Sequence, residues 1–78
     1  MPTIPKMEPV ESSNIHSVGH DGNALYVRFR GAGGTPGRLY RYRTADADVH
    51  QGMMGALSPG SYFADRVKHV HRGEQMQE

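Results

Sequence analysis

Ala24-Leu25-Tyr26-Val27-Arg28-Phe29-Arg30 is the stretch on which the predicted fold depends. Leu25, Val27 and Phe29 alternate with Tyr26, Arg28 and Arg30, so apolar side chains fall on one face and mostly polar ones on the other. This period of two is typical of a strand that covers a core on one side and faces water on the other. The stretch therefore predicts a half-buried β-strand.

Turn-forming residues flank this strand on both sides. Asp21-Gly22-Asn23 precedes it and suits a tight hairpin, because Asp and Gly tolerate positive φ. Residues 31–37 follow it with four glycines and one proline, which predicts a flexible hairpin loop. Outside these turns, residues 14–19 and 38–43 predict two further strands. Strands joined by short loops should be antiparallel neighbours.

The periodicity changes after the third strand. From Asp46 onward, apolar residues recur at helical spacing at Val49, Met53, Ala56 and Leu57, and Thr44 or Asp46 can cap the first turn. Ser58-Pro59 is typical of a second helix start, and this helix is expected to extend to about Val70. The predicted fold is α+β: a three-stranded antiparallel β-meander followed by two short helices packed on one face.

The length of 78 residues allows one domain with one small core. Residues 1–9 contain three prolines and predict a flexible N-terminal tail, and residues 73–78 predict a flexible C-terminal tail. A single domain over residues 10–72 remains.

The chain has no cysteine and no apolar run as long as a membrane span, so we expect a cytoplasmic protein without a membrane partner.

Four serines are the candidate nucleophiles, but none lies in a strand–turn–helix elbow motif. Ser58 is better explained as a helix cap, and Ser12-Ser13-Asn14 as a turn that bonds its own backbone. We therefore predict that the protein is not an enzyme and uses no cofactor.

The five histidines lack the spacing of zinc ligands. They are interpreted as mostly surface groups that titrate near neutrality, and no metal site is expected. These residues are His16, His20, His50, His69 and His71.

The net charge is only +1, but residues 24–43 contain five arginines and no Asp or Glu. If the Leu25 face covers the core, the opposite face presents four of these arginines around Tyr26 and Leu39. Arginines neutralise phosphates, and an aromatic ring among them can stack on a base. The alternative is an ordinary solvated sheet face covered by arginine stems. The candidate nucleic-acid-binding residues are Tyr26, Arg28, Arg30, Arg41 and Arg43.

Tyr40 and Tyr42 share one face of the third strand. We expect both rings in the core, with their hydroxyl groups reaching a backbone group. The alternative, an exposed stacking platform, would turn the arginines of this strand inward, and the cost of desolvating them opposes it.

The order of these signals resembles the KTSC domain family, which is named after a C-terminal extension of some lysyl-tRNA synthetases. The loop of residues 31–37 is longer than is usual there, His20 replaces a common aromatic residue, and Thr44-Ala45-Asp46 replaces a Val-Pro entry to the first helix. The matching pieces are Val10–Ile15, Val18–Asp21, Leu25–Phe29, Tyr40-Arg41-Tyr42, Ala56–Phe63 and Val67.

The resemblance implies a module that occurs alone in bacteria and phages and fused to a synthetase, and it implies RNA as the partner. The first functional hypothesis is therefore a non-catalytic nucleic-acid-binding module. The second is a protein-binding adaptor, such as a phage or prophage regulator of a host complex like the transcription machinery, using the methionines Met53, Met54 and Met76, the 31–37 loop and the N-terminal tail. The third is a domain that pairs with its own copy through a strand edge.

Overall fold

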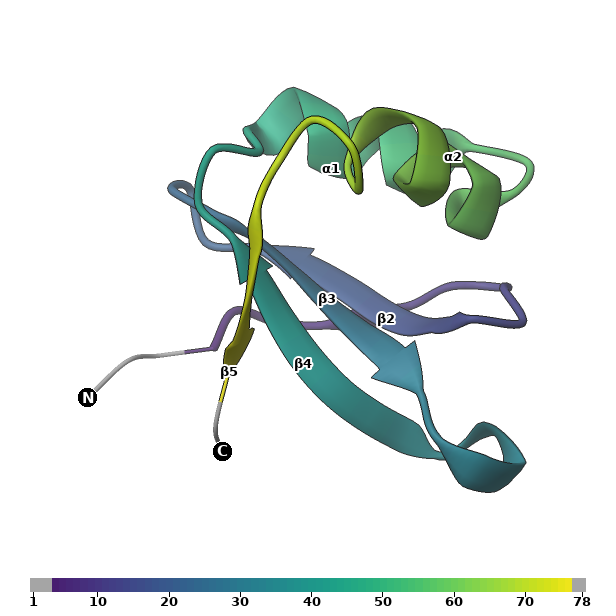
Figure 1. Ribbon diagram of the computed structural model, residues 1–78. Helices are drawn as coiled ribbons and strands as arrows, with labels where there is room; N and C mark the ends of the chain where they lie inside the picture. The colour runs from purple at the N-terminus through teal and green to yellow at the C-terminus, as the bar shows by residue number, and fades with distance from the viewer. Residues whose placement is uncertain (1–3, 77–78) are drawn as a thin grey trace.

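The computed structural model describes residues 4–76 and shows one antiparallel sheet with two helices above one face (Figure 1). The sheet order follows the chain order, β1-β2-β3-β4-β5. The α+β class and the two helices are confirmed, but the predicted number of three strands is wrong. The strands are β1 (Glu8–Pro9), β2 (Ile15–His20), β3 (Leu25–Arg30), β4 (Pro36–Tyr42) and β5 (Gly73–Met76), and the helices are α1 (Ala47–Gly55) and α2 (Pro59–Arg66).

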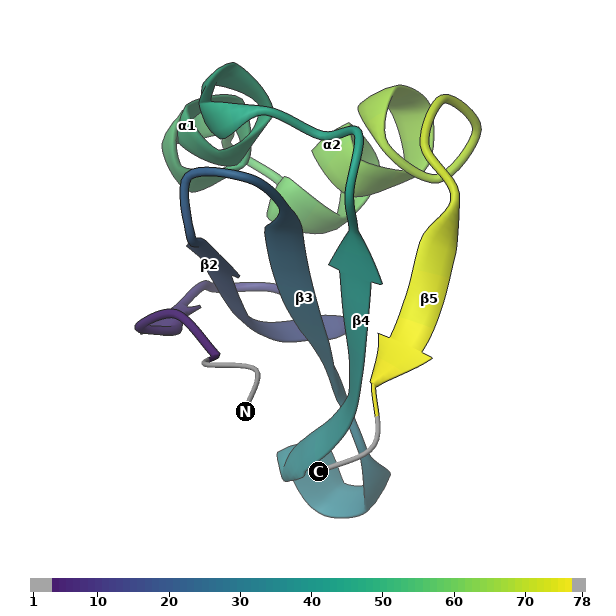
Figure 2. The same ribbon diagram turned by 90° about the vertical axis from the view of Figure 1, so that its left-hand side faces the viewer.

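The two additional strands form the edges of the sheet. β5 pairs antiparallel with β4, from Tyr42 opposite Gly73 to Leu39 opposite Met76 (Figure 2). Its sequence, Gly-Glu-Gln-Met, has no apolar alternation, and its pairing partner lies far away in the chain, so the local pattern predicted a tail instead. The predicted tails were residues 1–9 and 73–78. β1 and β5 lie inside these ranges and pair with the sheet, whereas residues 1–3 and 77–78 lie outside the described residues.

Both helices begin where the sequence predicts. The Asp46 carboxylate accepts a hydrogen bond from the Val49 amide at 3.2 Å, and the Ser58 hydroxyl accepts one from the Ser61 amide at 3.3 Å. These are N-caps that satisfy first-turn amides. Both helices end earlier than expected, so Leu57 and Val70 are exposed instead of packed. Neither helix, within residues 4–76, is long and apolar enough to cross a membrane.

The main core lies between the sheet and the helices. Leu25 and Val27 of β3 pack there against Met53 of α1 and Phe63 of α2, as the alternation predicts. Tyr42 belongs to the same cluster, and its burial raises the pKa of its hydroxyl to about 12. Tyr40 packs against this cluster but is only partly buried. The prediction that both rings lie in the core is therefore confirmed for Tyr42 and only in part for Tyr40.

A second, smaller apolar cluster lies apart from this core and contains Ala24, Tyr26 and Leu39. Met7, near the start of the chain, and Met76, in β5, pack against it. Tyr26 is only 3% exposed and Leu39 is fully buried. The expectation that Tyr26 and Leu39 lie on an open sheet face is therefore wrong, because the two edge segments of the chain cover them.

Candidate functional site

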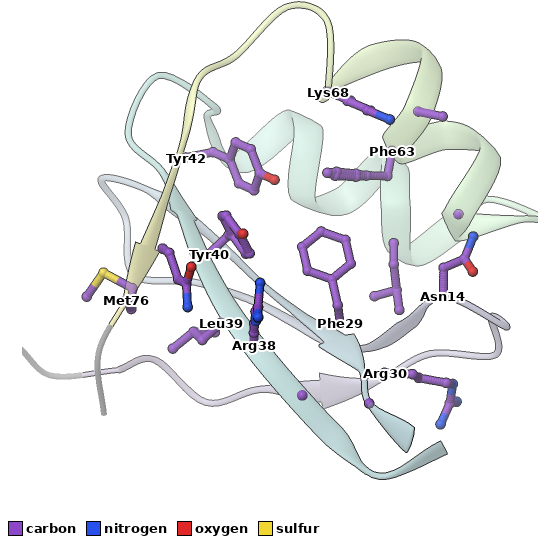
Figure 3. Close-up of a pocket in the computed structure, with 16 residues that line it drawn as sticks. Asn14, Phe29, Arg30, Arg38, Leu39, Tyr40, Tyr42, Phe63, Lys68 and Met76 are labelled. Atoms are coloured by element: carbon purple, nitrogen blue, oxygen red, sulfur yellow. The ribbon is translucent and has the colours of Figure 1, made fainter. Parts of the chain in front are cut away.

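A groove of about 920 Å³ lies between the sheet and α2. β3 contributes Phe29 to it, β4 contributes Tyr40 and Tyr42, and α2 contributes Phe63. Figure 3 shows these four side chains converging on one space between the sheet and α2. Aromatic residues from one face of β3 and β4 therefore meet an aromatic residue of α2 in this groove.

The four rings form a continuous series of edge and tilted contacts. Phe29 lies 5.4 Å from Tyr40 and 5.3 Å from Phe63 between ring centroids, and Phe63 lies 5.5 Å from Tyr42. Such contacts fix ring orientation beyond simple burial. Tyr42 and Phe63 are buried, whereas Phe29 and Tyr40 are partly exposed and present ring surface to the groove.

The charged residues along this groove are all basic. Arg30 of β3, Arg38 of β4 and Lys68, which follows α2, line it, and none of its described lining residues is Asp or Glu. Figure 3 shows Lys68 on the helix side and Arg38 on the strand side. Among residues 4–76, the side chains of Arg38 and Lys68 form no ion pair. The groove therefore combines aromatic surface with a field that attracts anions.

Arg30 is the only one of the five predicted site residues that lines this groove. Its guanidinium group donates hydrogen bonds to the Ser12 carbonyl at 2.6 Å and to the Gly34 carbonyl at 3.2 Å. These bonds tie the end of β3 to the segment before β2 and to the hairpin loop. A register irregularity between Arg28 and Arg30 changes the simple alternation at this point.

The other predicted residues are engaged elsewhere. The Arg28 guanidinium donates to the Gly37 carbonyl at 2.9 Å, and the buried Tyr26 hydroxyl donates to the Asp21 carboxylate at 3.3 Å. Arg41 and Arg43 both contact the Glu74 carboxylate. The structure therefore does not gather the five residues on one open surface, and a role for each of them in binding nucleic acid stays a prediction.

Sequence reasoning did not single out Arg38 or Lys68. Arg38 belongs to the acid-free stretch that drew attention to the sheet, so its charge was a usable signal. Lys68 gave no such signal, because its place on the same groove as Phe29 and Tyr40 depends on how α2 packs on the sheet.

Two of the histidines meet between β2 and α1. The His20 and His50 rings stack with centroids 6.1 Å apart. His20 Nδ1 accepts from the Gly22 amide at 3.0 Å, which leaves Nε2 to donate to the Ala45 carbonyl at 2.9 Å. Burial, and then the proximity of His20, lower the pKa of His50. Among the described residues, no group of three or more His, Asp or Glu side chains could hold a metal ion.

Ser12 and Ser58 accept hydrogen bonds from the backbone, as predicted. The Ser12 hydroxyl accepts hydrogen bonds from the Asn14 and Ile15 amides, both at 3.2 Å, and so closes the turn before β2. Ser58 caps α2.

The fold and groove define a small α+β domain in which an antiparallel sheet carries a helical hairpin on one face. The family model of the KTSC domain matches residues 11–71, and the chain belongs to this family. A crystal structure of a KTSC domain protein from Yersinia pestis is similar to this chain, with 31% identity and a TM-score of 0.79, over 92% of this chain and 97% of that one. No curated protein matches the chain.

Proposed function

We propose that this protein is a non-catalytic module that binds single-stranded nucleic acid, with RNA as the expected ligand, in the aromatic groove. The observation that carries the proposal is the composition of the groove: its described lining combines the partly exposed rings of Phe29 and Tyr40 with Arg30, Arg38 and Lys68 and includes no acidic residue. Bases stack on aromatic rings in a sequence-tolerant way, and cations nearby attract the phosphate backbone.

The rings and the cations make separate contributions, which can be measured separately. Each cation that neutralises a phosphate adds about 0.7 to the slope of log affinity against log salt for a single strand. Stacking adds affinity of about 1–3 kcal/mol per base without adding to that slope. The affinity of a ligand that binds in the groove therefore has both a salt-dependent and a salt-independent part.

The test is a fluorescence anisotropy titration with a labelled oligouridylate of about ten nucleotides at several salt concentrations. We expect Arg38→Gln and Lys68→Gln each to lower both the affinity and the salt slope. Arg66→Gln is the matched control, because it removes the same charge from an exposed position of α2 that does not line the groove. Tyr40→Leu should lower the affinity and leave the slope unchanged.

Equal effects of the Arg38, Lys68 and Arg66 variants would reduce the interaction to general charge attraction and overturn the groove proposal. Absence of oligonucleotide binding in low salt would overturn it as well. Capture of a protein that is retained after nuclease treatment would then favour the protein-binding adaptor.

A further inference from the structure

A second recess, separate from the aromatic groove, lies where β4 ends and β5 begins. It has a volume of about 520 Å³ and is lined by Arg43, Thr44, Arg72, Gly73 and Glu74. A hydrogen bond of 2.7 Å between the Thr44 hydroxyl group and Nδ1 of His71 joins the two segments that flank it. Figure 2 shows β5 and the loop leading into it beside β4. We call this recess the β4–β5 notch.

Glu74 holds the arginines at this notch. The β4–β5 register places Glu74 opposite Arg41, and a single carboxylate oxygen, Oε1, lies 3.2 Å from Arg41 Nη2 and 3.0 Å from Arg43 Nε. One anionic oxygen therefore serves two guanidinium groups. Guanidinium groups bind phosphate oxygens with the same planar donor geometry, so a phosphate can replace the carboxylate at this point.

The carboxylate does not use the full donor capacity of these arginines. Arg41 Nε is buried and has no hydrogen-bond partner within residues 4–76, although contacts with the Tyr26 hydroxyl and with Glu74 raise the pKa of Arg41. Among residues 4–76, the Arg72 guanidinium forms no ion pair. Two guanidinium groups, those of Arg41 and Arg43, thus contact one carboxylate, and a third, that of Arg72, lines the same notch. Asp21 does not add a second carboxylate here, because it bonds the Tyr26 hydroxyl and the Asn23 and Ala24 amides.

The Glu74 carboxylate is also replaceable. The side chains of Arg43 and Glu74 are 69% and 41% exposed, and exposed ion pairs contribute little to stability. An incoming anion therefore meets a weak internal competitor on a partly hydrated surface.

We propose that the β4–β5 notch is a phosphate-binding site formed by Arg43 and Arg72, which Glu74 occupies in the free protein as an internal competitor. Displacement of Glu74 frees Arg41 as a third donor. Because Glu74 is part of β5, phosphate binding loosens the pairing of this edge strand with β4. The site goes beyond the groove proposal and does not depend on it, since no residue that lines the notch also lines the groove among the described residues.

The test uses inorganic pyrophosphate as the probe and nuclear magnetic resonance of the arginine side-chain and β5 amide protons as the readout. We expect Glu74→Gln to bind pyrophosphate about fivefold more tightly than the unchanged protein, the upper end for loss of an exposed competing charge. Asp65→Asn is the matched control, because Asp65 is an exposed acid of α2 outside the notch, and it should change the affinity by less than about twofold.

A second variant keeps the test decisive if Glu74→Gln also loosens β5. Arg72→Gln leaves the contacts of Glu74 with Arg41 and Arg43 in place, and we expect it to weaken pyrophosphate binding in both the unchanged and the Glu74→Gln backgrounds. Equal affinities of the Glu74→Gln and Asp65→Asn variants, or no effect of Arg72→Gln, would overturn the proposal. Neither result bears on oligonucleotide binding in the groove, so the two proposals fail separately.

Discussion

Gly73 of β5 lies directly against the ring of Tyr42 on β4: a β-carbon at position 73 would come within 2.5 Å of Cε2 of that ring. The two residues are also register partners in the sheet. The absence of a side chain at position 73 therefore lets the edge strand approach the core tyrosine, and both the groove and the β4–β5 notch depend on this approach.

Gly73→Ala should move β5 away from β4, because the neighbouring atoms belong to a buried ring that cannot shift easily. We expect a loss of about 1–3 kcal/mol in the free energy of unfolding, as for other overpacked sites. Urea denaturation measures this loss, and amide hydrogen exchange should show faster exchange in residues 73–76. Gly55→Ala is the control, since a β-carbon there meets no atom within 4 Å. Equal stability of the two variants would contradict the close contact.

Leu39→Ala should be strongly destabilising, although the strand pattern alone would place Leu39 in water. The side chain is fully buried with Tyr26 beneath Met7 and Met76. Truncating a buried leucine costs about 2–5 kcal/mol of unfolding free energy. Leu57→Ala, at a fully exposed leucine, should change stability by less than about 0.5 kcal/mol in the same thermal or urea measurement. A mild effect at Leu39 would mean that the chain ends do not cover this cluster.

Tyr42 should ionise at a higher pH than an exposed tyrosine, and its ionisation should lower the stability of the protein. Burial, followed by the proximity of Tyr40, raises its pKa from 10.0 to about 12. The folded state therefore holds the Tyr42 proton more tightly than the unfolded state. The stability that protonated Tyr42 contributes is complete below pH 10 and is lost as the pH rises through about 12. Ultraviolet absorbance at the tyrosinate band follows the ionisation. Tyr42→Phe should remove the late-titrating component, and a normal titration of all tyrosines in the folded protein would refute the prediction.

His50 should make the protein less stable in acid. Its pKa is lowered by burial and then by His20, while Glu8 acts in the opposite direction. The unfolded state therefore binds a proton at His50 more readily than the folded state. The stability that neutral His50 contributes is present above the usual pKa of 6.5 and is lost as the pH falls below it. Urea midpoints measured from neutral pH down to about pH 5 should fall less steeply in His50→Leu. His69→Gln, at an exposed position, should keep the slope of the unchanged protein.

The candidate site was only partly accessible to sequence reasoning. The acid-free arginine stretch drew attention to β3 and β4, where a binding site stays a prediction, and the alternation correctly turned Tyr40 and Tyr42 toward the core. The exposed basic face expected around Tyr26 did not form as predicted, because a pattern of alternating residues gives two faces and does not specify what covers the second one. Arg38 and Lys68 meet at one groove only through the packing of α2 against the sheet.

The sequence by itself determined the elements whose causes are local. Apolar alternation predicted β3, glycine-rich turns predicted its hairpins, and the side chains of Asp46 and Ser58 marked the helix starts, because each of these effects acts within a few neighbouring residues. Tertiary structure alone decided the edge strands and the burial of Tyr26. The pair Arg41 and Glu74 shows the reason: 33 positions separate the two residues, so their contact follows from how the folded chain ends return to the sheet, which no local periodicity encodes.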